Sequence, residues 1–413
     1  MSPPSAPDDS RFEFHKIRRL PPYVFEEVNR LKAQLRAKGA DIIDFGMGNP
    51  DMPTPSHIVD KLIETARDPK AGRYSASKGI VGLRKAMAGY YGRRYGVKLD
   101  PDTEVIATLG SKEGFANLAQ ALTAPGDTVI CPNPAYPIHA YGFIMAGGVI
   151  RHVPALSPEQ YLQGIDRAVK HSAPRPSVLI LSYPSNPTAQ WVDLDFYKEA
   201  IRLAKKHELI VLSDVAYSEI YFDDNPPPRV LQVEGAKDIA VEVNSLSKTY
   251  AMAGWRVGMV VGNARICAAL ARVKSYLDYG AFTPVQVAAA AALNGPQDCV
   301  AEIRATYKSR RDVLVESFGR AGWDIPAPPA SMFAWSPLPK GWEDVGSLTF
   351  AKLLMEEAGV AVAPGVAFGE YGEGFVRIGL VENENRIRQA ARNVKKFLGS
   401  RERLLNRIAM AAE

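Results

Sequence analysis

The sequence has few cysteines and no long apolar run, and both absences restrict what the protein can be. Its 413 residues include three cysteines, Cys131, Cys267 and Cys299, which lie far apart and form no CxxC pair. Such a set argues against a disulfide framework or a zinc site and is typical of buried thiols in a reducing compartment. No apolar run reaches the roughly 18 residues of a membrane-spanning helix, and the Pro- and Ser-rich residues 1–11 lack the apolar core of a signal peptide. We therefore expect a cytoplasmic protein with no membrane partner.

The sequence also lacks the signatures of a nucleic-acid-binding, metal-dependent or nicotinamide-dependent protein. The net charge of +5 is small for this length and suits anionic small molecules better than nucleic acid. Neither GSKEG nor FGMGNPD supplies the GxGxxG turn of a dinucleotide-binding domain. The six histidines form no close pair, so we expect packing or surface histidines and no metal site; they are His15, His57, His139, His152, His171 and His207.

The pattern along the chain predicts two structural units. Residues 1–12 are expected to be disordered, and apolar spacing predicts a helix over 23–38. Between about 100 and 250, short β-branched runs alternate with amphipathic helices such as 194–207, which predicts an α/β fold with a mainly parallel sheet buried on both faces. The predicted strands are Glu104–Leu109, Thr128–Cys131, Val178–Tyr183, Leu209–Asp214 and Ile239–Val243.

The C-terminal third shows a different residue pattern, which predicts helices over 299–321, 347–358 and 384–398 around short extended runs. This pattern favours a smaller α+β domain. We therefore expect an N-terminal arm and helix at 1–45 that belongs to the small domain, a large domain at 46–290, and the C-terminal small domain at 291–413.

Unusual polar residues follow the predicted strands. The strands are succeeded by Gly110-Ser111-Lys112, by Pro132 to Pro137, by Pro184 to Thr188, by Asp214, and by Ser245-Leu246-Ser247-Lys248. Ligands of such sheets bind beyond the carboxyl ends of the strands, so we expect these residues to share one site.

Lys248 is the strongest candidate for covalent chemistry. A lysine is usually a solvated surface charge, but this one follows a strand and precedes an almost uncharged stretch. A desolvated lysine can lose its proton and form a Schiff base. Arg256, eight residues later, and Ser245 and Ser247 could hold a phosphate nearby. The free N–H groups at a helix start after Gly110 suit the same phosphate.

Four further residues have both a functional and an ordinary structural interpretation. Asp214 could pair with a protonated pyridine nitrogen or simply cap a helix. Tyr217 could direct its hydroxyl toward a phenolic oxygen on that ring. Asn186 could do the same or be a turn residue beside proline, and Tyr136 could stack on the ring or pack on the core.

These segments, in this order, resemble the class I/II aminotransferases of pyridoxal 5′-phosphate (PLP) fold type I. SLSKTYAMAGWRVG, NPAYP, YPSNPT and DVAY carry the resemblance, which covers about residues 12–400. It implies a large domain with a mainly parallel seven-stranded sheet and a smaller α+β domain. It also implies PLP bound to Lys248, with Asp214 on the pyridine nitrogen, Tyr217 and Asn186 on the phenolic oxygen, Tyr136 stacked on the ring, and Ser111, Lys112, Ser245, Ser247 and Arg256 around the phosphate.

The same resemblance implies how substrate is bound and how the protein assembles. Arg377 in GFVRIGL matches an arginine that clamps the substrate α-carboxylate, and Asn186 lies beside that substrate. Tyr74 matches a tyrosine that reaches the phosphate of a neighbouring subunit, which implies a homodimer with shared sites. Gly46 and Gly48 resemble a mobile segment that closes on substrate.

The amino donor is the open point at this stage. FGMGNPD, GSKEGFANL and KSYLDYGAFTPVQ are similar to bacterial glutamate–pyruvate (alanine) aminotransferases, which favours L-alanine with 2-oxoglutarate. LL-diaminopimelate or another amino acid, and a PLP-dependent C–S β-lyase, are the alternatives. A regulator domain without enzymatic activity is disfavoured, since only about 40 residues precede FGMGNPD. Arg19, Arg73 and Lys78 are candidate partners of a second substrate carboxylate, or ordinary surface charges.

Overall fold

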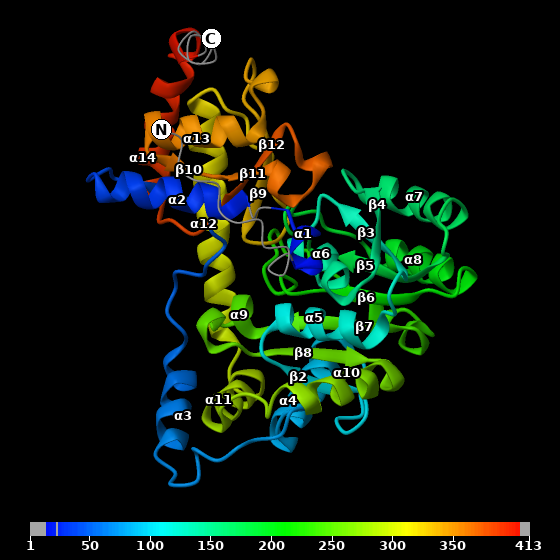
Figure 1. Cartoon of the computed structure of the whole chain (residues 1–413). Coiled ribbons are helices and arrows are strands. Elements are labelled where there is room, and N and C mark those ends of the chain that lie inside the picture. Colours follow the sequence, from blue (N-terminus) through cyan, green and yellow to red (C-terminus); the bar gives the residue numbers. More distant parts are fainter. Residues whose placement is uncertain (1–13, 22–23, 405–413) are drawn as a thin grey trace, which may run out of the picture.

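The computed structural model describes residues 14–21 and 24–404. Its centre is a seven-stranded sheet with the strand order β2-β8-β7-β6-β5-β3-β4 (Figure 1). The expected α/β class and the mainly parallel sheet are therefore confirmed. The strands are β2 (Val105–Thr108), β3 (Thr128–Asn133), β4 (Val149–Pro154), β5 (Pro176–Ser182), β6 (Ile210–Asp214), β7 (Ala240–Ser245) and β8 (Gly258–Gly262).

Strand direction brings the chain's polar turns to one edge of this sheet. β3, β4, β5, β6 and β7 are parallel, and β8 alone is antiparallel to both of its neighbours, β7 and β2. The carboxyl ends of the other strands and the amino end of β8 therefore meet at a common edge. In register, Gly258 at the start of β8 lies opposite Thr108 on one side and Ser245 on the other.

All five strands expected from the sequence are present, and two strands that the sequence patterns do not predict complete the sheet. β4 is an edge strand with partly exposed, partly polar residues, so it has no continuous apolar run. β8 is a short segment between two glycines and follows the Lys248 region too closely for an intervening crossover helix. Its antiparallel direction is what places the residues before Gly258 at the common edge.

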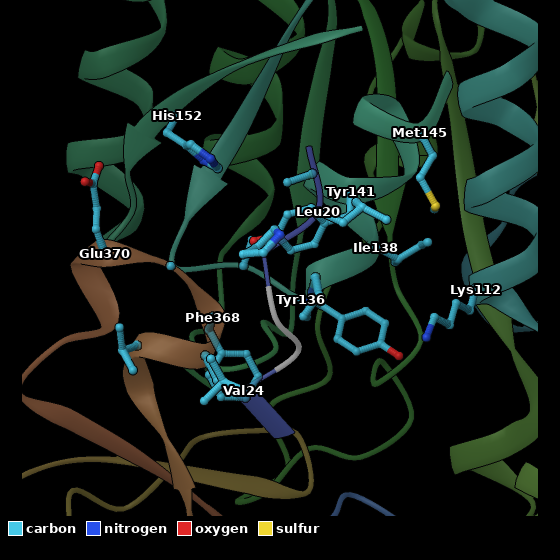
Figure 2. A pocket seen from close by; sticks show the side chains of 17 residues that line it. Leu20, Val24, Lys112, Tyr136, Ile138, Tyr141, Met145, His152, Phe368 and Glu370 are labelled. Atoms are coloured by element: carbon cyan, nitrogen blue, oxygen red, sulfur yellow. The ribbon is translucent and has the colours of Figure 1, made fainter. Parts of the chain in front are cut away.

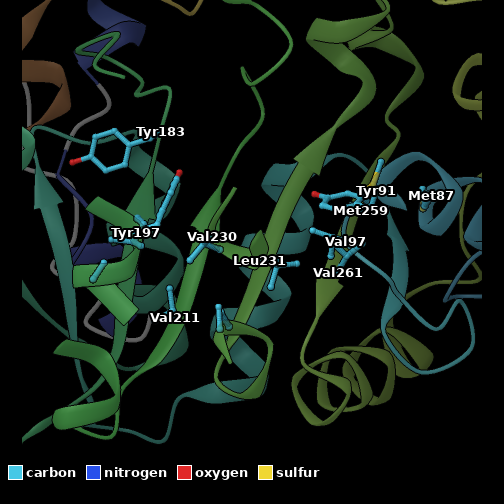
Figure 3. Packing of buried hydrophobic residues seen from close by; sticks show 14 of the residues in the cluster. Met87, Tyr91, Val97, Tyr183, Tyr197, Val211, Val230, Leu231, Met259 and Val261 are labelled. Carbon is cyan, nitrogen blue, oxygen red and sulfur yellow. The ribbon is translucent and has the colours of Figure 1, made fainter. Parts of the chain in front are cut away.

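Alternating side chains of the strands form separate cores on the two faces of the sheet. One face packs against α5 (Ser111–Leu122), α6 (Pro137–Ala146) and α10 (Ala264–Leu277). The other packs against α4 (Val81–Tyr95), α7 (Pro158–Lys170), α8 (Leu194–Lys206) and α11 (Thr283–Asn294). Figure 3 shows part of this second core, where Val211, Met259 and Val261 of the strands meet helix residues such as Met87 and Tyr197. Both faces are thus buried, as expected for a mainly parallel sheet.

Helix boundaries follow local capping chemistry. Asp193, Asn263 and Asn383 each accept hydrogen bonds from backbone N–H groups in the first turn of α8, α10 and α14 (Glu384–Leu398), respectively. Glycine in the left-handed conformation ends α4 at Gly96 and α13 (Ser347–Ala358) at Gly359. Three short helices complete this part of the chain: α1 (His15–Arg18), α3 (Ser56–Ala66) and α9 (Leu246–Thr249).

A smaller unit that includes the C-terminal part of the chain lies above the sheet (Figure 1) and has a separate, third core. It packs around an antiparallel sheet of β11 (Ala363–Pro364), β12 (Phe375–Gly379) and β9 (Phe333–Pro337). The helices are α12 (Asp298–Arg320), α13 (Ser347–Ala358) and α14 (Glu384–Leu398), in agreement with the predicted segments. α12 joins the two units, because Val300 packs in the core of the large sheet and Ile303 in the small one.

The N-terminal segment belongs to this smaller unit. The helix expected over 23–38 is α2 (Val24–Ala37), whose Val28 packs with Met355 of α13. β1 (Ile43–Asp44) then pairs in parallel with β10 (Val360–Ala361). These contacts support our proposal that residues 1–45 and 291–413 form the small domain and residues 46–290 the large domain. The disorder expected at residues 1–12 concerns a segment that lies outside the described residues.

No helix in the described part of the chain is long and apolar enough to cross a membrane. The three cysteines are free, and Cys131 and Cys267 are buried as expected. Cys299 is only half-buried, because it lies in the exposed first turn of α12; the expectation of a third buried thiol was wrong.

A buried ion pair under the sheet generates the first prediction. Arg229 and Glu242 have fully buried side chains, with Nη1 and Oε2 4.0 Å apart. Glu242 also accepts hydrogen bonds from the Tyr91 hydroxyl and the Leu231 N–H, and Arg229 donates to the Tyr95 hydroxyl at 2.7 Å. Burial raises the pKa of Glu242, and the Arg229 charge opposes that rise.

We expect Arg229→Met to lower the free energy of unfolding by about 3–5 kcal/mol, because it leaves a buried carboxylate without its cation. Chemical denaturation measures the change. Adding Glu242→Gln to this variant should recover part of the loss, since the uncompensated charge is then removed. A loss below about 1 kcal/mol in the single variant would contradict a role of this pair in stability.

Candidate active site

The residues expected to form the site line one cavity of about 630 Å³ at the common edge of the large sheet. This size is typical of a site for a cofactor with its substrate. The small domain closes the cavity from above with Phe333, Phe368 and Arg377. The sequence-predicted residues that line it are Gly48, Ser111, Lys112, Tyr136, Asn186, Asp214, Tyr217, Ser245, Ser247, Lys248, Arg256 and Arg377.

One end of the cavity can hold a dianion. Gly110 has a φ of +84° and leads into α5, so the first N–H groups of that helix point outward from the turn. The guanidinium of Arg256 lies directly over Gly110, where an added Cβ would meet Nη2 at 2.3 Å. Gly258 approaches the same turn closely, since a Cβ there would lie 2.7 Å from the Ser111 nitrogen. Only glycine permits this close approach at both positions.

Two serines extend the same end of the cavity beside the turn at Leu109–Lys112, which we call the anion-binding turn: Ser245 ends β7, which pairs with β8, and Ser247 lies in α9. The Ser245 Oγ accepts a hydrogen bond from the Ser247 N–H at 3.1 Å and so begins α9 directly after β7. This cap turns the chain sharply at the sheet edge, so that Ser247 and Lys248 both face the cavity. Arg256 reaches it from the opposite direction, through the antiparallel start of β8.

Lys248 is held in the environment that its proposed chemistry requires. Its Nζ donates to the Gly48 carbonyl at 2.6 Å. Burial lowers the pKa of Lys248 to about 7, and the positive charges of Arg377 and Arg256 contribute to the shift. The side chain is therefore present in large part as a neutral, nucleophilic amine near neutral pH.

Asp214 is buried at the end of β6 and has a partner that the sequence interpretation missed. Its Oδ2 lies 2.8 Å from Nε2 of His139, and its Oδ1 accepts the Ala216 N–H. The Nδ1 of His139 is buried and has no hydrogen-bond partner among the described residues. The tautomer with the proton on Nε2 fits this arrangement, because it donates to Asp214 and leaves only a bare acceptor unpaired.

His139 therefore corrects the expectation that every histidine is a packing or surface residue. The available signal was its position on α6, one helical turn after Tyr136, which directs both side chains to the same side of the helix. The two rings pack edge to face, with their centroids 5.9 Å apart. The described residues contain no cluster of three or more metal-binding side chains.

Arg377 and Asn186 come together from different domains. Arg377 on β12 donates through Nη1 to the Asn186 Oδ1 at 2.7 Å and through Nη2 to the Gly46 carbonyl at 3.1 Å. Its guanidinium lies over the rings of Phe333 and Phe368. A buried, planar guanidinium held in this way is well suited to a bidentate carboxylate contact.

Two tyrosines border the space between these groups. Tyr217 packs edge-on against Phe333 at 5.4 Å, and burial raises the pKa of its hydroxyl, which therefore stays protonated and able to donate. Tyr136 lies on the wall shared with a neighbouring, largely apolar cavity of about 510 Å³, where its hydroxyl points toward Lys112 (Figure 2).

Tyr74 and the three candidate partners of a second substrate carboxylate do not line this cavity. Tyr74 is 87% exposed and packs on Tyr279 instead. Arg19 donates to the Gly148 carbonyl at 3.0 Å, and Arg73 and Lys78 are exposed. For the three basic residues the ordinary surface interpretation fits this chain.

The cavity as a whole fits PLP. The turn at Gly110 with Arg256 suits its phosphate, the buried Asp214 carboxylate suits its pyridinium nitrogen, and the amine of Lys248 suits its aldehyde carbon. The turn at Gly110 follows β2, Arg256 precedes β8 and Asp214 ends β6 of the same sheet, with β7 between β8 and β6, so the sheet fixes the separation of the two ends.

A family model described as "Aminotransferase class I and II" matches residues 40–394. Among curated proteins, the "Putative aminotransferase AatC" of Rhizobium meliloti is 66% identical over 96% of this chain and 98% of its own length. The "Glutamate-pyruvate aminotransferase AlaC" of Escherichia coli is 51% identical over 92% of this chain and 93% of its own. An LL-diaminopimelate aminotransferase of Moorella thermoacetica is 42% identical over 94% and 98%.

Solved structures give the same picture. Substrate-bound BacF from Bacillus subtilis aligns with a TM-score of 0.88 at 33% identity, over 93% of this chain and 97% of that one. A variant of Thermus thermophilus aspartate aminotransferase aligns with a TM-score of 0.86 at 28% identity, over 93% and 99%.

The lowered pKa of Lys248 can be measured directly. We expect the cofactor-free protein to attach PLP with a rate constant that rises through a pKa of about 7 as its amine deprotonates. Stopped-flow absorbance would follow the reaction. Lys248→Ala, the control, should show no covalent attachment, no absorption band of a lysine-bound cofactor and no turnover. A rate that keeps rising toward the pKa of a solvated lysine would contradict the proposed environment.

Proposed function

Because the chain belongs to the class I and II aminotransferases, which depend on PLP, we propose that it transfers the amino group of L-alanine to 2-oxoglutarate, giving pyruvate and L-glutamate. The enzyme class follows from the family model and from relatives at 51% and 66% identity. The choice of alanine and glutamate draws on the relative named glutamate–pyruvate aminotransferase.

The distribution of charge in the cavity carries this proposal. Among the described residues that line it, the basic side chains are Lys112, Lys248, Arg256 and Arg377, and Asp214 is the only carboxylate. Asp214 is already engaged by His139. Arg377 thus remains for the substrate α-carboxylate, and the described lining offers no carboxylate for a second substrate ammonium, which favours alanine and glutamate over a diamino acid.

We propose a distinct task for each of these groups. Bound PLP supplies an electron sink for the charge that develops at the substrate Cα. Arg377 holds the α-carboxylate, and Asn186 braces Arg377 through the bond at 2.7 Å. The neutral amine of Lys248 then takes the Cα proton and returns it during the exchange of the amino group. Asp214, positioned by His139, keeps the pyridine nitrogen protonated.

The segment around Gly48 helps to exclude water from these steps. The carbonyls of Gly46 and Gly48 accept bonds from Arg377 and Lys248, so the segment lies across the cavity. Asp51 anchors its far end through two hydrogen bonds to Arg310, at 2.6 and 2.7 Å. A Cβ on Gly48 would meet the Phe333 ring at 2.5 Å, so this close approach depends on glycine.

LL-diaminopimelate is the second candidate donor, because several relatives at 41–42% identity carry that name. Glu370 lines the neighbouring cavity, where it could meet a distal ammonium (Figure 2). That residue is exposed and lies outside the cavity formed around Lys248, so the first donor is favoured.

A homodimer is supported by an exposed aromatic surface near the start of α11. Its large apolar side chains include Tyr74, Tyr276, Leu277, Tyr279 and Phe282, and all are more than half exposed. Monomeric proteins rarely leave such a group uncovered. We propose that a second copy covers this surface and that Tyr74 contributes to the partner's phosphate site.

We also propose that the protein works in the cytoplasm. Its three cysteines are free, which suits a reducing compartment, and its substrates would be metabolites of that compartment.

The donor assignment is tested by single half-reactions. The PLP form is mixed with one amino acid at a time, and conversion to the pyridoxamine form is followed by absorbance. L-alanine and L-glutamate should convert the cofactor fastest. Rapid conversion by LL-diaminopimelate with no response to alanine would transfer the assignment to the second candidate. Release of pyruvate and ammonia from cysteine without a 2-oxo acid would instead indicate a β-lyase.

Shared sites are tested by mixing two inactive variants. Lys248→Ala and Tyr74→Ala should each lose activity, Tyr74→Ala through weaker PLP binding. A mixed dimer then contains one doubly altered site and one intact site, so activity should return after subunit exchange. Mixing two batches of Lys248→Ala is the control. No recovery in a mixture shown to contain mixed dimers would contradict a shared site.

A further inference from the structure

A lysine outside the cavity is buried without contacting it. Lys274, in the last turn of α10, has 0% exposure. Its Nζ lies 2.9 Å from Oε1 of Glu113 and 2.8 Å from Oδ2 of Asp278. Burying an ammonium without a partner costs free energy, so Lys274 and its two carboxylate partners hold one another in place.

The first partner, Glu113, contacts the start of the anion-binding turn. Glu113, in the first turn of α5, accepts the Leu109 N–H through Oε2 at 2.8 Å. Leu109 directly precedes Gly110, and its carbonyl accepts a hydrogen bond from Arg256 at 3.3 Å. Glu113 therefore fixes the turn at its entry, while Lys274 fixes Glu113.

The second partner, Asp278, lies beside the exposed aromatic surface. The backbone carbonyl of Asp278 accepts a hydrogen bond from the Ser77 hydroxyl at 2.5 Å, and its Oδ1 accepts the Gly280 N–H at 2.6 Å. The next residue, Tyr279, packs on Tyr74 with ring centroids 4.7 Å apart. Asp278 thus joins the two chain segments that carry these tyrosines.

We propose that Lys274 is a positioning residue for cofactor binding: its ammonium connects the anion-binding turn at Leu109–Lys112 to the exposed aromatic surface that includes Tyr74 and Tyr279. This inference rests on PLP as the cofactor and does not depend on which amino acid is the donor. Without the ammonium, the partly buried carboxylates of Glu113 and Asp278 repel each other across the position that Lys274 fills. The turn and the aromatic surface then lose their common anchor, and the phosphate loses its preformed site.

The test is a PLP affinity measurement on the full-length enzyme. Lys274→Met keeps the length and apolar stem of the side chain and removes its charge. Equilibrium dialysis of the holoenzyme against a series of PLP concentrations should give a dissociation constant raised about tenfold or more, given the cost of an unpaired buried charge. The ³¹P resonance of the bound cofactor should shift as well, since its phosphate environment changes.

Arg311→Met is the matched control for a general loss of stability. Arg311 is also buried between two carboxylates, those of Asp223 and Asp312, but it lies in the small domain away from the turn. It should lower the melting temperature and leave the PLP dissociation constant and the ³¹P resonance unchanged. Equal effects of both variants on PLP binding would overturn the proposal.

Glu113→Gln provides a second route if Lys274→Met fails to fold. It keeps an acceptor for the Leu109 N–H but weakens the link to Lys274, so PLP binding should weaken in the same direction. Where both variants fold, their effects on the dissociation constant should be clearly less than multiplicative in the double variant, because they break one link. Unchanged PLP affinity in Glu113→Gln, or fully multiplicative effects, would refute a common anchor.

Discussion

The structure depends on the meeting of strand ends at one edge of the large sheet. The six strands that share a direction all end there, and the single antiparallel strand, β8, begins there. Asp214 and Lys248 are positioned from neighbouring strands, at the ends of β6 and β7, and Arg256 enters just before β8. Because backbone hydrogen bonds fix the spacing between strands, the groups that would bind the two ends of PLP keep their separation without direct contact.

This edge concentrates positive charge, and the fold must compensate for it. Lys248 lies close enough to Arg377 and Arg256 for their charges to lower its pKa, while burial contributes most of the shift. The same electrostatics that make a reactive amine also prepare the cavity for a phosphate and a carboxylate. Asp214 supplies the opposing charge at the other end, and His139 orients it.

The second domain completes the site and makes it adjustable. Arg377 reaches across to Asn186 from a small antiparallel sheet with its own core, and the Gly46–Gly48 segment lies between the two. Contacts between domains are made mainly by hydrogen bonds and aromatic edges in this region, so they can break and re-form as substrate enters. Farther from the cavity, Asp51 pairs with Arg310 and Lys274 with Glu113, and each pair joins segments that are distant in the chain.

Local chemistry in the sequence determined the α/β class, five of the seven strands and the residues that follow them. β-branched runs and capping residues act over a few positions, so the strand ending at Asp214 and the helix starting at Ser111 could be predicted. Tertiary structure alone decided what lies beside these residues. The direction of β8, the pairing of His139 with Asp214 and the burial of Lys274 all depend on segments distant in the chain. The residues next to each of these positions form no local pattern from which such a distant contact could be predicted. The lowered pKa that makes Lys248 reactive likewise arises from burial and from the positive charge of Arg377, which lies 129 positions further along the chain and comes within range only on folding.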